Sequence, residues 1–118
     1  MAQIKISIQF DSGARIGPGK AALLESIRDT GSISAAARSM GMTYKRAWLL
    51  LDSINQAFVE AVVIAAPGGS GGGGAALTPL GTDILKRYRR ILGKATTVAA
   101  SDLAALKARA RPKIGPKV

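Results

Sequence analysis

The segment 31–58, GSISAAARSMGMTYKRAWLLLDSINQAF, constrains the fold more than any other part of this chain. Either Ser32 or Ser34 is placed to cap a short helix, because serine side chains accept hydrogen bonds from the free N–H groups at a helix start. Gly41 then ends that helix, since glycine tolerates the left-handed conformation of a helix exit. Thr43 is placed to cap a second, longer helix. A short helix, a glycine turn and a longer helix with basic residues in its first turn predict a helix-turn-helix.

The longer helix has an apolar stripe and a polar side. At about 100° per residue, the stripe contains Ala47, Leu50, Leu51, Ile54 and Phe58. The opposite side contains Lys45, Leu49, Asp52 and Gln56, flanked by Arg46 and Ser53. Such a helix suits the major groove of DNA, although the same pattern occurs in solvated helices of any small helical domain. Trp48 lies at the edge of the stripe, where we expect it to pack against the core or against a neighbouring hairpin rather than to contact a DNA base.

The charge balance favours a polyanionic partner. The 118 residues carry 17 Lys+Arg against 7 Asp+Glu, a formal net charge of +10. Residues 81–118 hold ten basic and two acidic residues, whereas residues 1–80 hold seven and five. A strongly basic protein suits nucleic acid or an anionic membrane surface, although high charge alone also keeps a protein soluble. No apolar run reaches ~18 residues, so we expect no membrane span.

Cysteine and histidine are absent from the sequence. Their absence excludes thiol nucleophiles, disulfides, Cys/His zinc sites and histidine-based acid–base catalysis. The carboxylates are scattered along the chain without evident pairing. We therefore expect no enzyme, no cofactor and no metal site, and the cysteine-free composition fits a cytoplasmic protein.

The N-terminal residues 1–16 predict a β-hairpin. Apolar and polar residues alternate from Ile4 to Phe10, which is the period of a half-buried strand. Asp11-Ser12-Gly13 is a turn signal, and residues 14–16 form a short returning strand. We expect this hairpin to rest on the helical core or on a second subunit.

Residues 17–79 predict a three-helix core followed by a second hairpin. Pro18 suits the first turn of a helix, and Gly31 stops that helix. After the helix-turn-helix, β-type runs at 62–65 and 75–78 enclose a glycine-rich loop. A hairpin in this position is the wing of a winged helix-turn-helix, and its small residues let it approach a DNA backbone closely. The loop also matches GxGxxG, but it lacks the Lys-Ser/Thr of a nucleotide P-loop and opens no βαβ unit.

Residues 80–110 predict a long helix that follows a cap at Thr78. Its apolar residues recur at three- and four-residue steps, and a continuous helix spans about 45 Å with Gly93 as the position where it can bend. So long a stripe requires a partner, which predicts a homodimer. The residues expected at the dimer interface are Ile84, Tyr88, Ile91, Leu92 and Val98.

Basic residues continue along this helix and beyond it. Lys86, Arg87, Arg89 and Arg90 form either a solvated helix face or a DNA site. Residues 111–118 are predicted to be a disordered basic tail that adds non-specific attraction to phosphates.

Three runs of sequence, GSISAAARSMGMTYKRAW, GGSGGGGAALTPLG and ILKRYRRIL, resemble the DNA-binding half of molybdate-responsive regulators of the ModE type. More distantly, they resemble the LysR-type winged helices. The resemblance covers about residues 17–94 and implies a winged helix-turn-helix that dimerises through the helix after the wing and binds operator DNA. Full-length members continue into molybdate-binding domains, whereas this chain ends at Val118. We therefore expect no molybdate binding by this chain itself.

The resemblance also implies which residues bind DNA. Thr43, Tyr44, Lys45 and Arg46 match the start of the recognition helix. The wing residues are Gly69, Ser70, Gly71 and Gly72, within the matching run Gly69–Gly74. Ser34 and Arg38 are further candidates for phosphate contacts.

Together, these features predict a mainly α protein with small β-hairpins that regulates transcription as a dimer on double-stranded DNA. Lys45 and Arg46 are expected to reach base edges, favouring guanine O6 and N7 where geometry permits. Leu49 either touches a thymine methyl group or packs on a neighbouring chain. The alternatives are a winged-helix module that binds other proteins and a protein that binds DNA without sequence preference.

Overall fold

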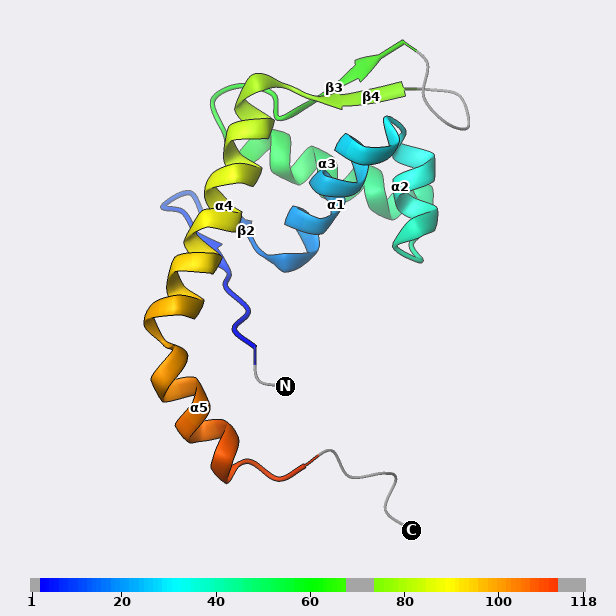
Figure 1. Cartoon of the computed structure of the whole chain (residues 1–118). Helices are drawn as coiled ribbons and strands as arrows, with labels where there is room; N and C mark the ends of the chain where they lie inside the picture. Colours follow the sequence, from blue (N-terminus) through cyan, green and yellow to red (C-terminus); the bar gives the residue numbers. More distant parts are fainter. Residues whose placement is uncertain (1–2, 68–73, 113–118) are drawn as a thin grey trace.

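The computed structural model describes residues 3–67 and 74–112 and is built mainly of helices (Figure 1). In chain order, the elements are β1 (Ile8–Gln9), β2 (Arg15–Ile16), α1 (Pro18–Thr30), α2 (Ile33–Ser39), α3 (Tyr44–Ala57), β3 (Val63–Ala66), β4 (Gly74–Leu77), α4 (Pro79–Val98) and α5 (Ala100–Arg109). The strands form two separate antiparallel hairpins, β1–β2 and β3–β4. The predicted class, mainly α with small β-hairpins in a winged helix-turn-helix, is confirmed. No helix within the described ranges is long and apolar enough to cross a membrane.

The first two helices begin and end where local chemistry predicts. Pro18 stands in the first turn of α1, and Gly31 ends α1 in the left-handed conformation, with a φ of 68°. Ser32 rather than Ser34 caps α2, because the Oγ of Ser32 accepts a hydrogen bond from the N–H of Ala35 at 3.1 Å. The helix-turn-helix therefore starts at the first of the two candidate serines.

Helices α1, α2 and α3 pack around one core. Leu23, Leu24 and Ile27 of α1 are fully buried, and each such side chain stabilises the fold by about 1.5–3 kcal/mol. Small side chains in α2 let it cross its neighbours closely, since they add little volume between the helix axes. The buried residues that α2 and α3 contribute are Ile33, Ala36, Ala37, Ala47, Leu51 and Ile54.

The β3–β4 hairpin is attached to the helical core at two points. On the β3 side, Asn55 of α3 accepts hydrogen bonds from the N–H groups of Val62 and Val63 at 2.8 and 3.1 Å, and donates one to the carbonyl of Val63 at 3.3 Å. On the β4 side, the N–H of Ala75 donates to the carbonyl of Gly31 at 3.0 Å. The hairpin therefore lies across one end of the core and is tied to both α3 and the α1–α2 turn (Figure 1).

Helix α4 starts in direct contact with the residue before β3. Thr78 caps this helix by accepting a hydrogen bond from the N–H of Gly81 at 3.0 Å, and it donates to the carbonyl of Ala61 at 2.7 Å. Gly81 is buried, and a Cβ at this position would overlap the carbonyl and the side chain of Val62. The close approach of α4 to Val62 therefore requires glycine at position 81.

The N-terminal hairpin is shorter than predicted. It pairs Ile8 with Ile16 and Gln9 with Arg15, whereas residues 3–7 form no strand. The returning strand ends at Ile16 because the chain turns there into α1, and so nothing pairs with residues 3–7. Their side chains nevertheless alternate between exposed and half-buried, as the sequence pattern predicts.

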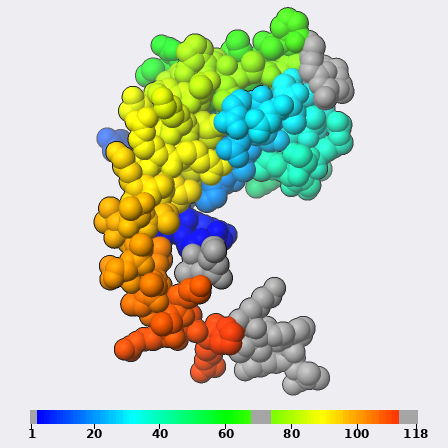
Figure 2. Space-filling model, in the orientation of Figure 1, coloured from blue at the N-terminus to red at the C-terminus, as the bar shows by residue number. Residues whose placement is uncertain are grey.

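The helix predicted over residues 80–110 is divided in two, and the break lies at Ala99 rather than at Gly93. Immediately before the break, the hydroxyls of Thr96 and Thr97 donate to the carbonyls four residues earlier, at 2.8 and 3.0 Å. Such hydrogen bonds bend helices because they compete with the backbone ladder. Helix α5 has no buried residue and projects away from the body of the molecule (Figure 2).

Candidate nucleic-acid interface

The first turn of α3 projects from the core into solvent. Thr43 caps the helix as predicted, since its Oγ1 accepts a hydrogen bond from the N–H of Arg46 at 3.1 Å. Thr43, Tyr44, Lys45 and Arg46 are all exposed. The inner face of the same helix is fixed by three buried residues, Ala47, Leu51 and Ile54. The structure therefore brings the four predicted DNA-binding residues of α3 together on one exposed turn.

The charges of this turn oppose the stability of the helix. A helix N-terminus carries a partial positive charge, so cationic side chains there are unfavourable by a few tenths to about 1 kcal/mol each. Helix α3 nevertheless begins with Lys45 and Arg46 and has no acidic residue in its first turn. An anion bound at the turn makes the same charges and the free N–H groups favourable. The turn is therefore better suited to an anionic partner than to an isolated helix.

The ion pairs engage Arg28 of α1 and Arg87 and Arg89 of α4, but no cation of the helix-turn-helix. The four ion pairs within residues 3–67 and 74–112 are Arg28–Glu25, Arg28–Asp29, Arg87–Asp83 and Arg89–Glu25, at 4.0, 2.9, 2.8 and 3.3 Å. The hydrogen bond to Asp29 raises the pKa of Arg28 above its ordinary value. None of these pairs includes a cation of β2, α2 or α3. The pairing of Arg87 and Arg89 favours the interpretation of the basic face of α4 as a solvated surface.

Two apolar side chains of α3 lie exposed beside the basic turn. Trp48 is 47% exposed and packs edge-on against Tyr44, with ring centroids 6.2 Å apart. The expectation that Trp48 packs against the core or the second hairpin is therefore wrong. Trp48 and Asn55 lie on the same side of α3, but it is Asn55, two turns further along, that contacts β3. Leu49 is 59% exposed and faces away from the core, as predicted.

The remaining candidate DNA contacts are only partly placed by the structure. Ser34 is half-buried in the first turn of α2, and Arg38 is exposed near its end. Gly69, Ser70, Gly71 and Gly72 of the glycine-rich loop lie outside the described residues, as do positions 113–118 of the predicted basic tail. The strands that carry this loop, β3 and β4, are paired as the sequence predicts, with Val63 opposite Leu77.

The residues expected at a dimer interface fall into two groups. Tyr88 is only 2% exposed, and Ile84 is half-buried against the same core. Tyr88 is thus part of its own chain's interior rather than of a surface for a second copy, because the N-terminal segment covers it. Ile91 and Val98 are 44% and 84% exposed, and Leu92 is half-buried. The uncovered apolar surface of α4 therefore starts at Ile91.

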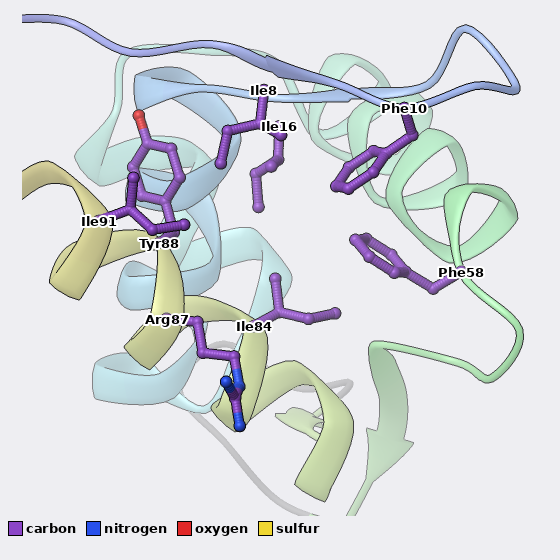
Figure 3. A pocket seen from close by; sticks show the side chains of 8 residues that line it. All are labelled: Ile8, Phe10, Ile16, Phe58, Ile84, Arg87, Tyr88 and Ile91. Atoms are coloured by element: carbon purple, nitrogen blue, oxygen red, sulfur yellow. The ribbon is translucent and has the colours of Figure 1, made fainter.

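An apolar pocket of about 250 Å³ opens between the N-terminal hairpin, the end of α3 and α4 (Figure 3). One side is the edge-to-face pair of Phe10 and Phe58, whose ring centroids are 5.4 Å apart. Across the pocket, the hydroxyl of Tyr88 donates to the carbonyl of Ile6 at 2.6 Å. The lining consists of Ile8, Phe10, Ile16, Phe58, Ile84, Arg87, Tyr88 and Ile91. The pocket is thus continuous, through Ile91, with the exposed apolar face of α4.

Three residues that shape the surface around α3 were not singled out from the sequence. Asn55 is one of them, and its amide fixes the start of β3 against α3. The available signal was an isolated amide in the last turns of an apolar helix, just before a β-type run. Arg15 and Lys20 line a groove together with Arg46, and no local pattern predicts that meeting because they lie on different elements.

Comparison with curated proteins finds relatives among molybdenum-related proteins. The molybdenum-pterin-binding protein MopB of Rhodobacter capsulatus is 50% identical over 80 residues, which are 68% of this chain and 30% of that protein. The DNA-binding transcriptional dual regulator ModE of Escherichia coli K12 is 35% identical over 104 residues, 86% of this chain and 40% of the regulator. The chain is homologous to ModE-type regulators.

The ModE-type resemblance predicted from the three sequence runs is therefore confirmed. The molybdenum transport protein ModE of Azotobacter vinelandii is a further relative, 36% identical over 87 residues, with 74% of this chain and 32% of that protein covered. This chain spans roughly a third of the length of such relatives. No protein-family model matches it. Over the matched residues, the chain is therefore similar to ModE-type proteins and to a molybdenum-pterin-binding protein.

Proposed function

We propose that this chain binds operator DNA as a homodimer, with α3 in the major groove and the β3–β4 hairpin as a wing on the adjacent backbone. The main observation behind this proposal is that the first turn of α3 has exposed cations and no acidic residue. Lys45 and Arg46 reach base edges, and Tyr44 and Thr43 lie beside them to contact the backbone. The ModE regulator of Escherichia coli K12, whose name describes it as DNA-binding, supports this proposal.

The proposed DNA surface also explains the uneven charge pairing. Acidic residues pair with Arg28, Arg87 and Arg89 of α1 and α4, whereas Arg38, Lys45 and Arg46 are in none of the ion pairs of the described residues. A polyanion supplies the missing charge, and this places the binding surface on α2 and α3. The protein would act where the chromosome lies, in the cytoplasm of a bacterial-type cell.

DNA binding tests this function directly. We expect the intact chain to retard pooled genomic fragments in gel-shift assays at about 50 mM salt, with affinity falling steeply at higher salt because bound phosphates release counterions. Contacts with six to ten phosphates reduce the association constant by roughly 10³–10⁵ between 50 and 200 mM salt. Failure to bind any fragment at low salt would favour the protein-interaction module. Equal affinity for every fragment would favour a non-specific DNA-binding protein.

The homodimer is proposed to form through the uncovered apolar face of α4 and its continuation on α5. Ile91, Leu92 and Val98 start this face, and Leu106, which is 68% exposed, extends it. Exposed apolar side chains at helical spacing favour association with an equivalent helix. A two-fold dimer presents two copies of α3, which can reach half-sites about one DNA turn apart.

Val98→Asp is expected to dissociate this dimer. Val98 is 84% exposed in the single chain, so the variant keeps its fold. Losing two buried valines across a two-fold interface weakens association by about 3–6 kcal/mol, roughly 10²–10⁴-fold. Sedimentation velocity at tens of micromolar is therefore expected to show a dimer for the parent chain and a monomer for the variant.

Thr97→Asp is the matched control for this dimer test. It adds the same charge at the neighbouring position, but at about 100° per residue its side chain points roughly 100–140° away from Val98, Ile91 and Leu92, outside the proposed interface. We expect it to remain dimeric. A monomeric parent chain, or two variants that behave alike, would contradict the proposed interface.

A further inference from the structure

A groove lies next to the first turn of α3, on the side away from the β3–β4 hairpin. It is an open groove of about 360 Å³ between β2, the start of α1 and α3. Three cations from these three elements line it, Arg15, Lys20 and Arg46, and no acidic side chain does. The other lining residues are Ser7, Gly17, Gly19, Met42 and Leu50. We call this the basic groove.

Lys20 is held in place within the basic groove. Its Nζ donates to the carbonyl of Arg15 at 2.9 Å and to the hydroxyl of Ser53 at 3.0 Å. An ammonium group has three donors, so these two bonds orient the group and leave a third donor for a ligand. A cation that is already positioned loses little conformational entropy when an anion binds.

The groove is continuous with the proposed DNA surface because Arg46 belongs to both. Ser53 and Arg46 lie on one flank of α3, whereas Asn55, which holds the β3–β4 hairpin, lies on the other, roughly 160° away at about 100° per residue. A helix in the major groove has a phosphate backbone on each side. The hairpin stands at one of these backbones and the basic groove at the other.

We propose that the basic groove binds a phosphodiester of the DNA backbone on the side of α3 opposite to the wing. Arg15 and Lys20 contact non-bridging phosphate oxygens and fix the register of α3, while bases are read by the turn that contains Lys45. This site rests on the proposed DNA-binding function and extends it to the N-terminal hairpin. A free phosphate has the same oxygen chemistry, and the test separates the two sources.

Arg15→Gln isolates this contact. Lys20 uses the backbone carbonyl of Arg15, so the substitution removes the guanidinium and leaves the hydrogen bonds of Lys20 in place. We expect the variant to lose affinity for operator and unrelated DNA by the same factor, because a phosphate contact carries no base preference. The slope of log K against log salt becomes shallower by about 0.9. The loss of DNA affinity relative to the parent chain is therefore about three- to fourfold larger at 50 mM than at 200 mM salt.

Two further variants and a titration with inorganic phosphate complete the experiment. Arg15→Lys is expected to restore most of the salt dependence, and Lys107→Gln, an equal charge change on α5, to behave as the parent chain. If the parent binds DNA and Arg15→Gln has an unchanged slope, the basic groove is not a DNA contact although the proposed function stands. A parent chain that binds no DNA overturns both proposals. Saturable binding of inorganic phosphate by the parent, lost in Arg15→Gln without any change in DNA affinity, assigns the groove to free phosphate instead.

Discussion

Lys45→Glu combined with Arg46→Glu is expected to abolish sequence-specific DNA binding while the chain stays folded. Each well-placed contact between a cationic side chain and guanine contributes about 1–3 kcal/mol of discrimination, so loss of two contacts weakens specific binding by roughly 30- to 10⁴-fold. Reversal of charge adds repulsion from the phosphates and carries the expected loss toward the upper end of this range. The measurement is a gel shift or fluorescence titration with a selected operator at fixed salt.

The fold of this double variant is protected by the geometry of the helix start. Thr43 already accepts a hydrogen bond from the N–H of residue 46. A glutamate at position 46 can complete a capping box with Thr43, and acidic side chains in a first turn complement the helix dipole. We therefore expect the midpoint of unfolding to stay unchanged or to rise. A variant that unfolds would point to an unrecognised structural role for this turn.

The charge-matched control is Lys86→Glu combined with Arg90→Glu on α4. Both side chains are exposed, and the change in net charge is the same. We expect this control to retain operator binding, with only the modest general weakening that a less basic protein shows. If the control loses binding and the α3 variant keeps it, the basic face of α4 is the DNA site and the assignment of α3 is overturned.

Gly81→Ala is expected to destabilise the fold by about 1–3 kcal/mol, the usual effect of forcing an extra methyl group into a packed site. The added Cβ would overlap the carbonyl and the side chain of Val62. Val62 is fully buried, and its N–H is bound by Asn55 at 2.8 Å, so the neighbour has little freedom to move. Alanine favours a helix over glycine by up to about 1 kcal/mol, which offsets only part of the clash.

Gly93→Ala, in the same helix, is expected to have the opposite effect on the stability of the fold. A Cβ at position 93 meets nothing within 4 Å, so only the helix preference acts. This control should therefore be more stable than the parent by up to about 1 kcal/mol. Urea unfolding at one fixed protein concentration measures both variants, because association changes the apparent stability. Two glycine variants that shift the midpoint in the same direction would contradict the close contact between α4 and Val62.

Features that depend on neighbours in sequence were predictable. The caps at Thr43 and Thr78 and the helix exit at Gly31 each involve hydrogen bonds or backbone angles within a few residues. The same holds for the turn through Gly41, which has a φ of 65°. These local signals sufficed to predict the order of the helices and of the second hairpin.

Features that depend on contacts between distant segments were not predictable. Tyr88 fits an outward apolar stripe by spacing, but the chain's own N-terminal segment covers it through the bond to Ile6. Trp48 lies on the boundary of α3, and it is exposed because the hairpin contacts that side of the helix two turns further along, at Asn55. Arg15 and Arg46 line the same groove, and this could be predicted only if the position of the N-terminal hairpin relative to α3 were known. The hydrophobic pattern along one helix carries no information about such contacts between distant segments.

Because Gly81 has no side chain, its close contact with Val62 also affects how a movement of α4 is transmitted to neighbouring elements. Because α4 rests directly on Val62, and Asn55 binds Val62 to α3, the three elements have no soft layer between them. A rotation of α4 about its axis is therefore expected to press on Val62 and to be passed to the start of β3 and to α3 together. A force applied at the far end of α4 is therefore expected to reach both the β3–β4 hairpin and α3. The lack of a side chain at position 81 thus couples the C-terminal helix to both of the proposed DNA contacts.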